Sequence, residues 1–172
     1  MLTKIDLCSM ALLKLGEGPI QSLNDDTASA QLGRTLFDPV IETLLAMHPW
    51  RFACRMFELN KTSDGYFQIP ADVLRVLKCD GQIMGDRIYH NADTLPVWAI
   101  ARIPVEHFPS YFVTLAVTRL AMEFCIPLVG EQTVMRMLIS LYESELQTAK
   151  FIDSTISENV PIADFSLINS RF

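Results

Sequence analysis

Hydrophobic residues recur along this chain with two different periods, and the change of period divides it into parts. In residues 4–15 and 28–47, apolar side chains return every third or fourth position, as on one face of an α-helix. Residues 52–103 contain short stretches in which apolar and polar residues alternate, which is typical of strands. Helical spacing returns over residues 110–126 and 131–151. The pattern predicts a mainly α, α+β fold, a bundle of about four helices with a small antiparallel sheet inserted between helices two and three.

Local signals mark the ends of the first two helices. Thr3 followed by Asp6 is a variant of the capping box, and Thr27 is a second candidate N-cap. Gly16 suits the left-handed conformation that often follows a helix end. Pro39 removes one hydrogen bond from the second helix, but the apolar period continues through it in phase. We therefore expect a kink at Pro39 rather than two separate helices.

Three further signals concern the β portion and the third helix. Asp80-Gly81 between two strand-like stretches indicates a two-residue hairpin, because glycine accepts a positive φ. Pro127 and Gly130 are expected to end the third helix.

Trp50 stands where the helical period ends and the strand period begins, directly after Pro49. A large aromatic side chain at such a corner suggests either a catalytic loop or a packing wedge that fixes the angle between helix two and the sheet. No apparent catalytic group stands beside it in the sequence, which favours the structural wedge. A tryptophan buried there needs an acceptor for its ring N–H.

The end of the chain changes character after Ser154. Pro161 interrupts any helix, yet the segment is too apolar for a solvating tail. It either packs on its own bundle or orders on a partner. We expect a single domain over residues 1–154 and an extended C-terminal arm over residues 155–172, because terminal segments are usually loose until they are tied down. The expected partner-docking residues of this arm are Ile162, Phe165, Leu167, Ile168 and Phe172.

Composition and charge narrow the classes of function. Half of the 172 residues are hydrophobic, slightly more than a monomer of this size needs, and the surplus suits a subunit interface. A formal net charge of −6 disfavours tight binding to DNA phosphates. The N-terminus has no cationic stretch before an apolar one, so we expect no signal peptide. The longest apolar region, residues 108–129, contains two charges and two prolines, so we expect no membrane span.

Cysteines and histidines show no metal-ligand spacing. The four cysteines are far apart, so free and mostly buried thiols in a reducing cytoplasm are expected, with a disulfide or a zinc site as the weaker alternative. The histidines are isolated and are expected at the surface or at helix ends. These residues are Cys8, Cys54, Cys79, Cys125, His48, His90 and His107.

Catalytic signals are equally weak. Asp25 and Asp26, with Glu17 nearby, form the best carboxylate cluster, and paired carboxylates serve glycoside hydrolysis when they flank a sugar cleft. Adjacent acids before a helix more often complement its dipole, which is the interpretation we prefer. Cys54 has no identifiable base. The sequence predicts no catalytic residue, no cofactor and no metal.

Several short motifs occur in one order along residues 4–150. They are ALLKLGEGPIQSL, HPWRFA, IPADVLRVL, DRIYHN, FPSYFVTLAVTRLAMEF and LYESELQTAK. Each is degenerate, but the ordered set resembles the tail tubular protein A family, the head-to-tail adaptors of short-tailed phages and related prophages. Residues 155–172 lie outside the resemblance.

The resemblance implies a structural function in a virion, at the head-tail junction, after assembly in the host cytoplasm. Family members are helical bundles with a small β portion that form a ring, commonly of twelve copies, beneath the portal protein. The ring extends the DNA channel and offers a platform to the next tail component, a nozzle or tail tube protein. Packaged DNA would pass without specific binding, and the resemblance supplies no catalytic residue. The alternatives are a phage-associated cell-wall hydrolase and an unrelated cytoplasmic interaction domain.

Overall fold

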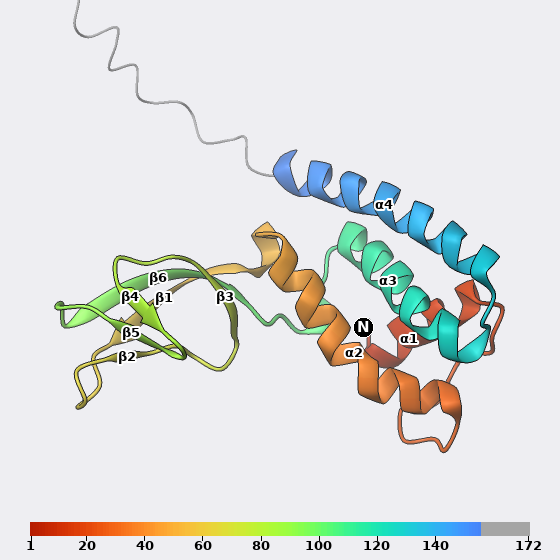
Figure 1. The fold of residues 1–172 in the computed structure, drawn as a ribbon, viewed down its shortest axis with the longest axis horizontal. Helices are drawn as coiled ribbons and strands as arrows, with labels where there is room; N and C mark the ends of the chain where they lie inside the picture. The colour runs from red at the N-terminus through yellow and green to blue at the C-terminus, as the bar shows by residue number, and fades with distance from the viewer. Residues whose placement is uncertain (156–172) are drawn as a thin grey trace, which may run out of the picture.

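Four α-helices and a β portion between the second and the third make up residues 1–155, the part of the chain that the computed structural model describes (Figure 1). This confirms the mainly α, α+β fold expected from the periodicity. The helices are α1 (Lys4–Lys14), α2 (Ala28–Met47), α3 (Ser110–Leu128) and α4 (Gln132–Thr155).

α3 is the central helix of the bundle. It contacts α1, α2 and α4, and α4 runs along its outer side (Figure 1). Among the described residues, α3 is the one helix long and apolar enough to cross a membrane, and half of its apolar window is buried inside the protein. A core helix of a bundle meets the same test, because it is apolar on most of its faces.

The predicted ends of α1 and the start of α2 are confirmed. The Thr3 hydroxyl accepts from the Asp6 amide at 3.2 Å, while the Asp6 carboxylate accepts from the Thr3 amide at 2.8 Å, so the capping box is complete. Thr27 caps α2 by accepting from the amide of Ala30 at 3.2 Å. Gly16 has φ +80°, the left-handed conformation expected after α1.

Two prolines lie inside helices. Pro39 lies inside one continuous α2, as the unbroken apolar period indicates. Pro127 was expected to end α3, but this was wrong: the helix continues to Leu128, because a proline φ fits a helix and only one backbone donor is lost near the end. The turn closes at Gly130, which has φ +69° and donates to the Cys125 carbonyl at 2.9 Å.

α4 is longer than its sequence pattern indicates. It runs to Thr155 rather than residue 151, so the first residue of the expected arm belongs to the helix. The remaining arm, residues 156–172, lies outside the described residues, and so do all five of its expected docking side chains.

The β portion consists of two three-stranded antiparallel sheets rather than the single sheet expected. One has the order β1-β6-β3 and the other β2-β5-β4. The strands are β1 (Cys54–Asn60), β2 (Phe67–Gln68), β3 (Val73–Lys78), β4 (Gln82–Met84), β5 (Arg87–Tyr89) and β6 (Thr94–Ala101).

The hairpin expected at Asp80-Gly81 is wrong. β3 pairs with β6, and β4 pairs with β5, so this dipeptide connects the two sheets. The tight turn lies at Gly85-Asp86 instead, where Gly85 has φ +63°. Gly81 is small for another reason: a Cβ there would lie 2.4 Å from the Cγ2 of Ile88. A glycine can thus mark close packing as well as a turn.

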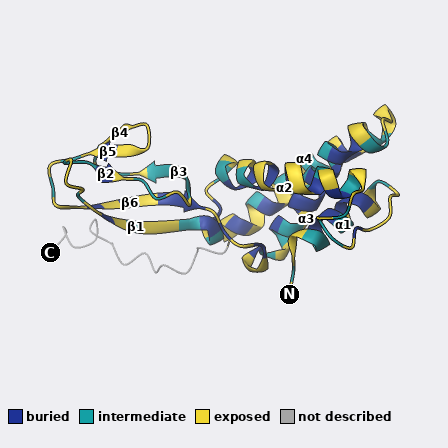
Figure 2. Cartoon of the chain, turned by 90° about the horizontal axis from the view of Figure 1, so that it is seen from below, coloured by how far each residue is buried: buried dark blue, intermediate teal, exposed yellow. Residues whose placement is uncertain are grey.

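Two hydrophobic clusters stabilise the described chain. The larger fills the bundle, and the smaller fills the β portion around Phe67, Ile88 and Val97. Phe57 packs against both clusters, and β6 supplies Val97 to one and Ile100 to the other. Figure 2 shows the buried residues gathered in these two regions. β1 and β6 therefore join the bundle and the β portion, the two lobes of the described chain, through packed side chains.

Trp50 belongs to the larger cluster, that of the bundle, and is fully buried. Its Nε1–H donates to the Leu44 carbonyl at 2.8 Å, which supplies the acceptor that its burial requires. Its ring meets Phe112 of α3 edge-on, with centroids 5.4 Å apart, and also lies near Phe52 and Tyr111. These ring contacts place Trp50 between the end of α2 and the start of α3.

We predict that Trp50→Ala lowers the free energy of unfolding by about 3–5 kcal/mol, because it removes a large buried aromatic and leaves the Leu44 carbonyl without its indole donor. Denaturant unfolding measures the loss. Tyr89→Ala is the matched control, since that ring is 48% exposed, and it should cost much less. An unchanged midpoint for Trp50→Ala would show that this ring does not stabilise the corner.

Candidate interaction surfaces

The carboxylates considered for hydrolysis serve their own loop. Asp25 accepts from the Ser22 amide at 3.0 Å, and Asp26 accepts from the Gln31 side-chain amide at 3.1 Å. Glu17 is exposed just after α1. These local bonds order the connection before α2.

The cysteines are free over the described residues, two of them buried and two half-buried. Burial raises the pKa of Cys8 to about 12. The pKa of Cys54 is also raised, chiefly by burial and further by the negative charge of Asp153. A thiol held protonated is a poor nucleophile, so the environment of Cys54 opposes the catalytic alternative.

Histidines do not gather with other metal ligands. No group of three or more histidine, cysteine, aspartate or glutamate side chains within residues 1–155 has the geometry to hold a metal ion. His90 accepts from the Ala92 amide through Nδ1 at 3.2 Å, a local turn contact. His48 lies close to Asp153, with Nε2 and Oδ2 3.8 Å apart.

Asp153 is the one buried acid among residues 1–155, and its side chain ties α4 to the corner after α2. The residue is 2% exposed. Its two oxygens accept from the Arg51 amide at 3.1 and 3.2 Å, and Oδ1 also accepts from the Tyr111 hydroxyl at 2.7 Å. Three elements therefore meet at one carboxylate: α4, α3 and the short helix Arg51–Ala53.

The surroundings of Asp153 keep its neighbours in defined protonation states. Burial, then the hydrogen bond and charge of Asp153, raises the pKa of Tyr111, so its phenol remains a donor. Burial lowers the pKa of His48, against the opposing effect of Asp153, so the imidazole is largely neutral at pH 7. The carboxylate is thus stabilised by hydrogen bonds more than by an ion pair.

Sequence reasoning missed Asp153, although a signal was present. Counting back along the helix, Asp153 shares a face with the largely apolar positions Ala149, Leu146 and Tyr142. An acid on the apolar face of a helix indicates a buried acceptor with specific donors. The predicted helix ended at residue 151, so Asp153 was not assigned to this helix face.

α4 has an exposed flank without charge along most of its length. The positions follow helical spacing and lie beside the face that packs on α3. Two of the hydroxyls in it bond back to their own helix, Thr148 to the Ser144 carbonyl at 3.0 Å and Thr155 to the Ile152 carbonyl at 2.8 Å. We call this surface the α4 flank; it consists of Met137, Leu141, Ser144, Thr148, Phe151, Ile152 and Thr155.

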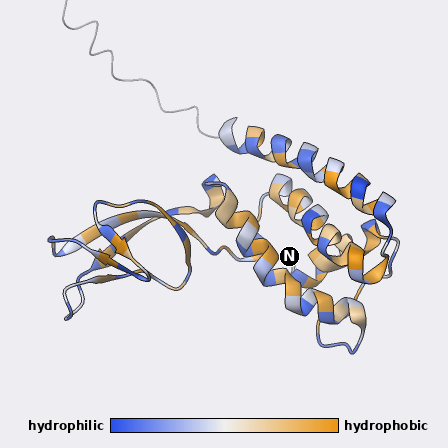
Figure 3. Cartoon of the chain, in the orientation of Figure 1, coloured by the Kyte–Doolittle hydropathy of each residue, from blue (hydrophilic) through white to orange (hydrophobic). Residues whose placement is uncertain are grey.

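Charged residues of α4 lie on a different side. Arg136 and Glu143 are exposed and Lys150 is partly exposed, all three outside the flank. Figure 3 shows hydrophilic and hydrophobic positions alternating along α4 as the helix turns.

Beside the flank a small pocket of about 150 Å³ opens between α3 and α4, lined by residues that include Ser144, Thr148 and Glu145. Glu145 accepts from Lys14 through Oε1, while its buried Oε2 has no hydrogen-bond partner among residues 1–155.

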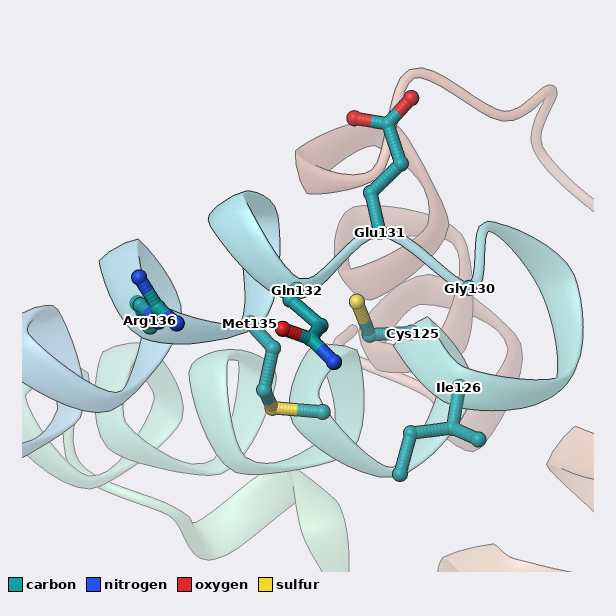
Figure 4. Close-up of a pocket in the computed structure, with 7 residues that line it drawn as sticks. All are labelled: Cys125, Ile126, Gly130, Glu131, Gln132, Met135 and Arg136. Carbon is teal, nitrogen blue, oxygen red and sulfur yellow. The ribbon is translucent and has the colours of Figure 1, made fainter.

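A second pocket lies at the turn between α3 and α4 (Figure 4). Its volume is about 410 Å³. Burial raises the pKa of Cys125, so the thiol in this pocket is protonated. The lining mixes hydrocarbon, sulfur and one pair of opposite charges and contains no catalytic pair; it consists of Cys125, Ile126, Gly130, Glu131, Gln132, Met135 and Arg136.

Comparison with known proteins gives no independent assignment. A scan against protein-family models finds no match to this chain, and a search of curated proteins finds none either. Evidence for the function therefore comes from the residues and surfaces of the chain itself.

We predict that Asp153→Ala lowers the free energy of unfolding by about 2–3 kcal/mol, because the Arg51 amide and the Tyr111 hydroxyl lose their buried acceptor. Glu143→Ala, an exposed acid on the same helix, is the matched control and should change stability little. Chemical denaturation measures both. Equal, small effects of the two substitutions would show that the carboxylate does not anchor α4.

Proposed function

We propose that this protein is a head-to-tail adaptor of a short-tailed phage or prophage. Copies assemble as a ring beneath the portal protein, extend the DNA channel and present a platform to the next tail component. The order of motifs along residues 4–150 suggests the family, and the fold, a helical bundle with a small β portion, agrees with it.

The α4 flank is the observation that carries the proposal. Residues 137–155 span roughly 27 Å of helix at 1.5 Å per residue. Four of the seven flank residues, Met137, Leu141, Phe151 and Ile152, are exposed apolar side chains, and an exposed apolar patch marks an interaction site. A second copy is its proposed occupant, because α4 runs along the outer side of the bundle (Figure 1) and the exposed flank residues on it are suited to a neighbour packed side by side.

Glu145 supports the same interface. Its Oε2 is buried without a donor within residues 1–155, beside the flank. A buried acceptor without a partner costs free energy in the monomer, and a donor from a neighbouring copy would recover it. The resulting contact is heterologous, since the flank of one copy meets a different surface on the next, and a rotation that closes gives a ring.

Other parts of the fold fit the remaining roles. The β portion extends from one end of the bundle (Figure 1), where it is accessible to another tail component. The arm from residue 156 onward is the proposed contact with the portal, and many copies around a ring would add their affinities. No observation on the described residues favours the cell-wall hydrolase.

We predict that Met137→Glu with Leu141→Glu prevents ring formation, because two charges on the flank cannot be desolvated at the interface. Purified portal is mixed with the wild type and with the variant, and negative-stain imaging scores rings on the portal. The matched control is Ser140→Glu with Gln147→Glu, two exposed positions of α4 outside the flank, which should still form rings.

Two results of this experiment would contradict the proposal or its interface. If the flank variant assembles as well as the control pair, the α4 flank is not the subunit interface. If the wild type itself forms no ring with portal, the adaptor proposal is wrong. Circular dichroism of each variant checks that its helices are intact.

DNA binding offers a separate prediction. We expect weak, salt-sensitive binding to duplex DNA at most, because an acidic protein of net charge −6 gains little from counterion release. A passage that DNA must slide through benefits from such a surface. Fluorescence anisotropy over a salt series measures the affinity, and tight binding that persists at physiological salt would contradict a channel of this kind.

A further inference from the structure

The outer face of the β1-β6-β3 sheet carries an exposed apolar pair. Met56 of β1 and Trp98 of β6 are direct partners in the antiparallel register. They are 68% and 41% exposed, while their neighbours Val97 and Ala99 point into the core of the β portion. In a sheet the residue opposite lies about 5 Å away on the same face, so the two side chains form one continuous apolar ledge.

Trp98 separates two adjoining pockets. One, of about 200 Å³, is lined by residues that include Met56, Pro96 and Lys78. The other, of about 450 Å³, is lined by residues that include Pro49 and Arg51. The two pockets adjoin at Trp98, and we call them together the Trp98 groove.

The end of α4 reaches this groove. Asp153 and Ser154 line the same pocket as Trp98, and the described chain stops one residue later, at Thr155. Asp153 holds that end in place through the Arg51 amide. The following 17 residues, 156–172, therefore begin at the mouth of the groove.

We infer that residues 156–172 of the same chain bind in the Trp98 groove of the free protein. Their apolar side chains, Phe165 and Leu167 among them, match the Met56–Trp98 ledge. Ten residues of extended chain reach up to about 33 Å, so Phe165 has ample length to return to the ring. Attachment at Thr155 makes the contact intramolecular, with an effective concentration in the millimolar range.

Charge does not oppose this occupant. The segment contains Glu158 and Asp164 and one basic residue, Arg171. The two pockets are lined by the bases Arg51 and Lys78 and by the acids Asp153 and Asp80, so the groove carries no excess of negative charge that would repel the segment. The contact needs no partner and does not depend on the proposed adaptor function. Docking of the arm on another protein would require it to leave the groove.

The two tryptophans make the inference measurable in the full chain. Trp50 is fully buried, so quenching of fluorescence by added iodide reports mainly on Trp98. Replacing Phe165, Leu167 and Ile168 by serine should expose Trp98, raise the quenching constant severalfold and shift the emission to longer wavelength. The matched control, Ser166→Ala with Asn169→Ala and Ser170→Ala, should quench like the wild type. Trp98→Phe, measured alongside, should remove most of the quenchable signal.

Three results would contradict the inference. Equal quenching of the wild type and the serine variant would show that the segment does not cover Trp98. Protection of Trp98 that appears only as protein concentration rises, together with dimers in sedimentation, would assign the groove to a second copy. A synthetic peptide of residues 156–172 added to the serine variant should restore protection, and its failure to do so would count against the groove as the binding site.

Discussion

The hydrogen bond from the indole of Trp50 to the Leu44 carbonyl is the contact on which the corner between α2 and α3 depends. Pro49 has no N–H, and it holds His48 in an extended conformation, so the last turn of α2 loses a donor for its carbonyls. The indole N–H of Trp50 supplies a donor for one of these carbonyls, that of Leu44. Its ring then packs edge-on against Phe112, and so the direction of α2 is fixed relative to α3 by the same side chain. From that corner the chain enters β1 with little freedom.

Asp153 extends this corner to the last helix. The backbone amide of Arg51, one residue after Trp50, donates to a carboxylate from the end of α4, and Tyr111 of α3 donates to the same carboxylate. A surface helix otherwise held by apolar contact would slide along its neighbour at small cost, whereas directed hydrogen bonds to a buried acid select one register. The α4 flank and the Trp98 groove are therefore held in a fixed relation, because both are attached to residues 50–54.

The sequence predicted what depends on neighbours along the chain. Helix periodicity, the Thr3–Asp6 box, the Thr27 cap and the left-handed Gly16 need only local interactions. The hairpin at Asp80-Gly81 failed because strand pairing is decided by residues far apart: β3 found β6, and Gly81 is needed for contact with Ile88. The burial of Trp50 could be inferred from a break in period. The contact of Asp153 with Arg51 could not, since 102 residues separate them.

Interaction surfaces are harder to infer from a sequence than cores. The sequence of α4 shows that its uncharged residues recur with helical spacing. Which side of the helix stays exposed is known only from the structure, where Leu138 and Ala149 are buried in the bundle. The Met56–Trp98 ledge needs the register of two strands that lie about 40 residues apart. The ledge is apolar and the flank is uncharged, and a small surface of either kind gives weak binding alone. A weak contact along the flank would suit the proposed ring, because a rigid junction lets each copy present it in the same geometry and closure of the ring adds the free energies of the contacts.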